Sequence, residues 1–166
     1  MSEHKKLMQE FVSAAGITEI DSWVAKYPSD QKQSAVMSAL MVVQQERGYI
    51  TSEAMDAVAA YLEMPAIAVY EVVNFYSMYE REPLGRNLIN VCTNVSCKLR
   101  GASDIVTHLE KNLQIKLGET TKDKRFTLRA VECLGACVNA PMMQVNRDYH
   151  ENLTSETVSA VLEQYE

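Results

Sequence analysis

The chain has 166 residues, of which 47% are hydrophobic and 23% charged, and its formal net charge is −6. These proportions are typical of one globular domain or two small ones, and they exclude a mostly disordered chain. The negative charge argues against nucleic acid as a partner, because phosphate backbones would repel it. Neither a secretory signal nor an apolar run long enough to span a bilayer is visible, so we expect a cytoplasmic protein without direct membrane insertion.

Residues 1–80 have a helical pattern and are predicted to form a small helical bundle. A short helical turn is expected over residues 22–26, and Ser29 or Asp30 is expected to cap the next helix, which ends at Gly48. Thr51 or Ser52 is expected to cap a third helix, and a fourth begins near residue 65. Helical spacing predicts these inward-facing residues: Val36, Leu40 and Val43; Met55, Val58, Ala59 and Leu62; Val69, Val72, Val73 and Tyr76.

Residues 81–86 read as a charged connector with proline and glycine, and residues 87–166 have a different texture. Strands are predicted over 87–92, 126–133 and 141–145, with a further short strand at 148–150. Helices are predicted over 102–113 and 155–165, the second capped by Thr154. The order β-α-β-β-α predicts a small mixed sheet covered by helices, which resembles a thioredoxin-like domain. The whole chain is therefore assigned to the α+β class.

The four cysteines all lie in this second half, as two closely spaced pairs. Cys92 and Cys97 are separated by four residues, and Cys133 and Cys137 by three. Each pair follows a predicted strand, so the two loops can face each other at one rim of the sheet. The four thiolates are then expected to converge on a single point. Four thiolates are the ligand set of a [2Fe–2S] cluster. Cys92, Cys97, Cys133 and Cys137 are therefore the predicted ligands of one such cluster, and no catalytic residue is predicted.

The residues around the cysteines suit a loop that wraps a bulky cofactor. Gly135 has no Cβ, so the backbone can turn tightly there. Loops of this kind can aim N–H groups at sulfur, which raises the reduction potential. We expect Leu134, Val138 and Met142 to shield the cofactor from water.

Other interpretations of the cysteines remain open at this point. Zinc is often held by four cysteines, although zinc sites mostly use tighter Cys-x-x-Cys pairs. Disulfides are rare in a reducing compartment, and a thioredoxin-type dithiol would need a Cys-x-x-Cys pair. Four unrelated buried cysteines would have no reason to pair in loops that follow strands. A zinc-stabilised interaction module is the main rival of the cluster.

The cysteine pattern and its surroundings resemble one family closely. The matching segments are Val91-Cys92 with Cys97 and Gly101, 133–137 (CLGAC), 139–143 (NAPMM), 45–50 (QERGYI) and 73–77 (VNFYS). Together they resemble the thioredoxin-like [2Fe–2S] subunit of NADH–quinone oxidoreductase (respiratory complex I), which in bacteria is the E subunit. The resemblance covers roughly residues 30–166, and no ligand position departs from it.

The resemblance implies an N-terminal helical bundle for docking and a thioredoxin-like [2Fe–2S] ferredoxin domain. It implies a partner flavoprotein subunit that binds FMN and NADH, and further subunits of the peripheral arm. The chain would then be a non-autonomous electron-transfer subunit of an oxidoreductase, which takes electrons from the partner's flavin on the cytoplasmic side of the inner membrane. Similar chains serve NAD-linked formate dehydrogenases and hydrogenases, which remain alternative hosts.

Overall fold

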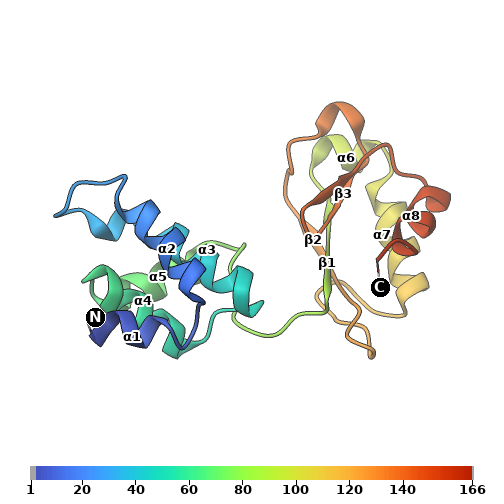
Figure 1. Ribbon diagram of the computed structural model, residues 1–166. Helices are drawn as coiled ribbons and strands as arrows, with labels where there is room; N and C mark the ends of the chain where they lie inside the picture. Colours follow the sequence, from blue (N-terminus) through green and yellow to red (C-terminus); the bar gives the residue numbers. More distant parts are fainter. Residues whose placement is uncertain (1–2, 166) are drawn as a thin grey trace. The chain divides into compact units, whose positions relative to one another are not determined.

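The computed structural model describes residues 3–165 (Figure 1). The chain divides into two compact units, Met1–Pro83 and Leu84–Glu166. The division falls within residues 81–86, the segment with the composition of a connector. None of the described helices is both long and apolar enough to cross a membrane.

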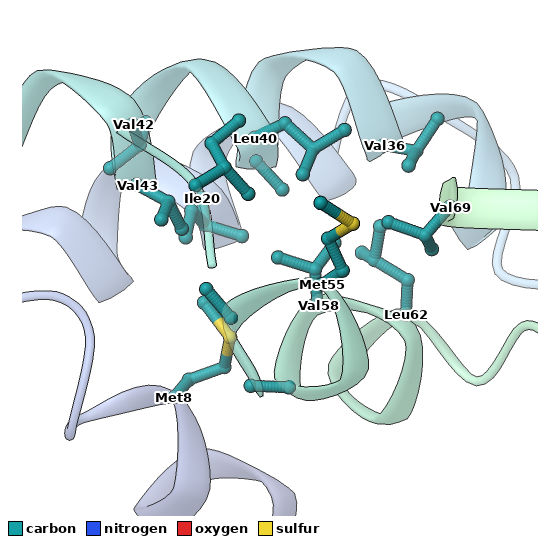
Figure 2. Packing of buried hydrophobic residues seen from close by; sticks show 14 of the residues in the cluster. Met8, Ile20, Val36, Leu40, Val42, Val43, Met55, Val58, Leu62 and Val69 are labelled. Carbon is teal, nitrogen blue, oxygen red and sulfur yellow. The ribbon is translucent and has the colours of Figure 1, made fainter. Parts of the chain in front are cut away.

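The first unit is made of helices around one apolar core (Figure 2). Its helices are α1 (Glu3–Met8), α2 (Ala14–Val24), the 3-10 helix η1 (Lys32–Ala35), α3 (Val36–Arg47), α4 (Ser52–Leu62) and α5 (Ala66–Phe75). The residues predicted to face inward on α3 and α4 are all buried, which confirms the helical pattern there. On α5, Val69 and Val73 are buried and Val72 is partly buried against the core, but Tyr76 is 38% exposed. The prediction for Tyr76 is wrong because the helix ends at Phe75 and Tyr76 continues in extended backbone.

Two helix ends in this unit follow the predicted signals. The Thr51 side chain caps α4 by accepting a hydrogen bond from the Ala54 N–H at 3.2 Å. Gly48 ends α3 in the left-handed region, with φ of 82°, where glycine has no steric penalty. The C-terminal end of α3 and the N-terminal cap of α4 were therefore predictable from the sequence.

The start of this unit differs from the expectation. The helical turn expected at residues 22–26 is the end of a longer helix, α2, which Ser13 caps by accepting from the Gly16 N–H at 3.1 Å. Neither Ser29 nor Asp30 caps α3, because α3 continues directly from η1 and its N-cap position is Ala35. A tight turn of 3-10 helix here replaces the side-chain cap.

The second unit is a four-stranded mixed sheet with helices packed on it (Figure 1). Its elements are β1 (Asn87–Cys92), α6 (Val95–Leu99), α7 (Ala102–Leu113), β2 (Phe126–Val131), the 3-10 helix η2 (Cys137–Asn139), β3 (Met143–Val145), β4 (Asp148–His150) and α8 (Ser155–Leu162). The strand order is β2-β1-β3-β4, in which β1 runs parallel to β2 and antiparallel to β3. This arrangement confirms the predicted α+β class and the small mixed sheet.

The sheet register brings both cysteine loops to one edge. Because β1 and β2 are parallel and Cys92 pairs with Val131, the two strands end side by side. α7 and α8 pack beside each other against the sheet, and their apolar side chains form its core with those of β1, β2 and β3. The site therefore lies at the carboxyl ends of two adjacent parallel strands.

Three element boundaries and one helix in this unit differ from the prediction. The last helix, α8, ends at Leu162 rather than at residue 165. β2 ends at Val131, two residues before Cys133, so the second cysteine loop starts earlier than expected. β3 begins at Met143 rather than at residue 141, and the Ala140–Pro141 peptide is cis. The helix α6 was not predicted, because its five residues are too few to show a period.

Candidate metal centre

The first cysteine pair is built from the end of β1 and the short helix α6. Cys92 is the last residue of β1, and Cys97 lies in the middle of α6. The helix starts where it does because the Asn94 side-chain oxygen accepts a hydrogen bond from the Val95 N–H at 2.8 Å. Cys92 and Cys97 are only 2% and 1% exposed, so both thiols lie within the fold.

The second cysteine loop packs onto these buried thiols. Cys92 and Cys97 belong to a small apolar cluster with Ala102, Ala140 and Met142, and Leu134 and Ala136 pack against it. Leu134 and Ala136 lie between Cys133 and Cys137, so they bring the second loop over the first pair. The convergence of the two loops, expected from the strand order, is thus present in the structure.

The second pair lies on an exposed loop. Cys133 follows β2 and Cys137 begins η2, and both residues are exposed. Their sulfur atoms are 3.4 Å apart. Gly135 lies between them with φ of 91°, a conformation that L side chains rarely adopt. Its N–H donates to the Cys133 sulfur at 3.4 Å, which is the kind of N–H···S contact expected around a sulfur-ligated cofactor.

Burial and neighbouring thiols keep two of the cysteines protonated when no metal is bound. Burial raises the pKa of Cys97 to about 11, and the nearby Cys92 thiol adds to the shift. The Cys133 thiol raises the pKa of Cys137, with a further contribution from Cys92. All four cysteines are free thiols. Since metals bind thiolates, loading this site must displace protons.

The four thiols stand as two pairs, which differs from the expected convergence on a single point. Within residues 3–165, no three His, Cys, Asp or Glu side chains surround one point closely enough to hold a lone metal ion. A two-iron cluster has a different requirement, because each iron takes two of the four sulfurs. The pairs Cys92/Cys97 and Cys133/Cys137, joined through the packing of Leu134 on the first pair, fit that donor set.

Three side chains hold the loops together in ways the sequence did not indicate. Asn94, beside the first pair, donates to Glu132 Oε2 at 2.6 Å and so links the two loops. The Tyr149 hydroxyl, on β4, donates to the Leu134 carbonyl at 2.6 Å. Asn139 donates to Glu151 Oε2 at 2.7 Å. No spacing rule pairs these residues, because the contacts depend on the register of the sheet.

The three residues expected to shield the cofactor differ in their exposure. Met142 is 1% exposed and Leu134 is half-buried, as predicted. Val138 is 95% exposed, so the prediction for this residue is wrong in the isolated chain. It lies in η2, whose described residues are not buried. Val95 and Leu99 of α6 are also exposed, by 65% and 81%.

Known proteins resemble both units of the chain. The family model for the thioredoxin-like [2Fe-2S] ferredoxin matches residues 20–166. The E 2 subunit of the NADH-quinone oxidoreductase of Rhizobium meliloti (strain 1021) is 46% identical over 147 residues, which are 89% of this chain and 86% of that protein. The E subunit of the NADH-quinone oxidoreductase of Rickettsia typhi (strain ATCC VR-144 / Wilmington) is 47% identical over 143 residues, which are 86% of this chain and 84% of that protein.

A solved structure shares the fold at lower identity. The NAD+-reducing [NiFe]-hydrogenase in its H2-reduced state aligns with a TM-score of 0.68 and 22% identity. The alignment covers 78% of this chain but only 22% of the hydrogenase chain, so it supports the fold alone. The family match and the curated relatives, by contrast, span most of both sequences. The chain therefore belongs to the thioredoxin-like [2Fe–2S] ferredoxin family, together with the E subunits of NADH–quinone oxidoreductase.

Proposed function

We propose that the chain holds one [2Fe–2S] cluster on Cys92, Cys97, Cys133 and Cys137 and transfers electrons within an NADH–quinone oxidoreductase. When bound, the cluster supplies a carrier that takes and returns one electron. The observation that carries the proposal is the meeting of two free thiol pairs at one edge of the sheet. Relatives at 46% and 47% identity that are named as E subunits of this oxidoreductase support the choice of host complex.

The residues around the two cysteine pairs have different roles. Met142, Ala102 and Ala140 enclose the buried pair and keep water from its sulfurs. The exposed pair lies at the surface, where a redox partner can approach. Low solvent access on one side and proximity to a partner on the other suit an electron-transfer site. Hydration and N–H···S contacts together set the reduction potential of the cluster.

We further propose that a flavoprotein subunit holding FMN and NADH docks over the exposed pair and performs the oxidation of NADH. Val95, Leu99 and Val138 are exposed apolar residues next to the cysteines in the chain. Large exposed apolar side chains beside a functional site are typical of a surface that a partner covers. The chain then acts on the cytoplasmic side of the inner membrane as a non-autonomous subunit.

The helical unit is proposed to dock as well, onto neighbouring subunits of the peripheral arm. Ile67 and Phe75 on α5 are 67% and 80% exposed, whereas Val69 and Val73 of the same helix are buried in the core. Both are large side chains of the type that interfaces bury. Co-purification with its neighbours would also separate the proposed host from a formate dehydrogenase or a hydrogenase.

The test is a redox titration of the chain purified without oxygen. We expect a coloured protein whose visible absorption bleaches on dithionite reduction and which then shows an electron paramagnetic resonance signal from one unpaired electron. The matched control is the same chain refolded with zinc, which should be colourless and silent. A wild-type chain that is colourless and already contains zinc after purification would support the zinc-stabilised interaction module instead and overturn the proposal.

A further inference from the structure

We propose that Tyr149 is a positioning residue that sets the reduction potential of the cluster by fixing the Leu134–Gly135 peptide. The inference rests on the proposed function, because it concerns the cluster held by Cys133. It assigns a role to a side chain on β4, outside both cysteine loops.

Two hydrogen bonds converge on one peptide group in the second cysteine loop. The Leu134 carbonyl accepts from the Tyr149 hydroxyl at 2.6 Å. The N–H of the same peptide, on Gly135, donates to the Cys133 sulfur at 3.4 Å. In a planar trans peptide the carbonyl and the N–H point in opposite directions. Holding the oxygen toward Tyr149 therefore aims the hydrogen at the sulfur.

This peptide needs an external support. Gly135 has φ of 91°, and no atom beyond its two chain neighbours lies within 4 Å of the place where its Cβ would be. Glycine populates both signs of φ readily, so rotation of the peptide meets little steric resistance on this side. The residue is also exposed, so packing does not fix its N–H. The Tyr149 hydroxyl supplies the missing restraint.

Tyr149 is well placed to act as a fixed donor. It lies on β4, where it pairs with Gln144 of β3. Just beyond it, the Asn152 N–H donates to the Asn139 carbonyl at 2.7 Å, and the Leu153 N–H to the Pro141 carbonyl at 3.0 Å. These two hydrogen bonds attach the segment after β4 to residues 139–141, which follow the second cysteine loop. Tyr149 itself is 48% exposed, so its hydroxyl could bond water instead and is not needed to pair a buried polar group.

The direction of the effect follows from charge. Reduction adds a negative charge that is shared by the sulfur ligands, and a donor aimed at sulfur stabilises that state more than the oxidised one. The N–H···S contact therefore raises the reduction potential. Loss of the Tyr149 hydroxyl releases the peptide, weakens the contact and lowers the potential.

The experiment compares Tyr149→Phe with wild type by potentiometric titration of the full-length, cluster-loaded chain. We expect the variant to keep its iron and the equilibrium between reduced and oxidised forms to shift toward oxidised by up to about tenfold, or about 59 mV for one electron. The matched control is Tyr165→Phe. It removes a hydroxyl that bonds Asp148 at 3.0 Å and His150 at 2.9 Å, on the same strand, but not the cysteine loop. The control should keep the wild-type potential.

Two further measurements distinguish positioning from general damage to the fold. After exchange into D2O, pulsed paramagnetic resonance should show a weaker coupling from one exchangeable deuteron in Tyr149→Phe, the one on the Gly135 nitrogen. Replacement of Tyr149 by 4-aminophenylalanine, which keeps a donor at the same place, should restore the potential. This variant also decides the question if Tyr149→Phe loses iron, because a restored cluster at the wild-type potential requires the donor.

A loaded Tyr149→Phe chain with the wild-type potential would overturn the inference, as would an equal shift in Tyr165→Phe. Either result would leave the proposed function intact. A wild-type chain that takes up no cluster would overturn the proposed function first, and the inference with it. The two failures are therefore distinguishable in the same set of samples.

Discussion

Cys92 and Cys97 are buried among apolar side chains, whereas Cys133 and Cys137 lie on an exposed loop turned by a glycine. The first pair takes its position from a strand and a helix, and so belongs to the fold whether or not metal is present. The second pair is held by a few hydrogen bonds and by packing of Leu134. The site thus joins a rigid half inside the protein to an adjustable half at the surface.

The largest expected effect is the same for both pairs. Cys97→Ala and Cys133→Ala should each abolish iron binding, because each leaves one iron with a single protein sulfur. Substitutions in the two pairs should differ in their effect on stability only in the metal-free chain. There Cys97→Ala leaves a cavity and should cost about 1 kcal/mol of unfolding free energy, while Cys133→Ala should stay within about 0.5 kcal/mol of wild type. Iron analysis and urea unfolding measure both quantities. Full iron in Cys133→Ala would exclude it as a ligand.

A second substitution tests the rigid half by itself. Met142 is 1% exposed beside Cys92 and Cys97, so Met142→Ala should destabilise the metal-free chain by about 2 to 5 kcal/mol. Val138→Ala is the matched control next to the exposed pair. Since Val138 is 95% exposed, its truncation should change the unfolding free energy by less than about 0.5 kcal/mol. Equal losses in the two variants would contradict the contrast between the pairs.

Alkylation of the metal-free chain tests accessibility directly. Iodoacetamide should modify Cys133 and Cys137 at least about tenfold faster than Cys92 and Cys97, which must wait for local opening of the fold. Peptide mapping by mass spectrometry at successive times gives the four rates. If the two pairs reacted at the same rate, the buried pair would not be part of a stable fold without metal.

The smallest expected effect concerns the link between the loops. Asn94 caps α6 and donates to Glu132, so Asn94→Ala should cost about 1 kcal/mol of unfolding free energy. Asn94→Asp is the sharper comparison, because it keeps the capping oxygen but places a carboxylate against Glu132. If the link between the loops matters, the aspartate variant should also lose iron faster to a chelator than wild type. Identical iron release would limit Asn94 to its capping role.

The sequence was informative where a periodic pattern or a spacing carries the structure. The predicted bounds of β1 and α7 match the structure, because both elements have enough residues for their apolar pattern to show. The cysteine spacing and the strand before each pair also indicated that the loops converge. The contrast in burial was not predictable, since it arises from α6, a helix of five residues that places Cys97 inside.

Contacts between distant segments were likewise out of reach. Tyr149 and Leu134 are brought together by the pairing of β4 with β3, and no local property of either residue announces it. Val138 was expected to shield the site because it is apolar, yet its place in η2 leaves it exposed. Hydrophobicity alone does not separate a core residue from one that a partner covers.

The central claim is that two differently placed thiol pairs share one two-iron cofactor. Quantifying iron, acid-labile sulfide and zinc in the chain purified without oxygen tests it most directly. We expect about two iron atoms and two sulfide ions per chain, with no more than traces of zinc. One equivalent of zinc without sulfide, or iron without sulfide, would contradict it.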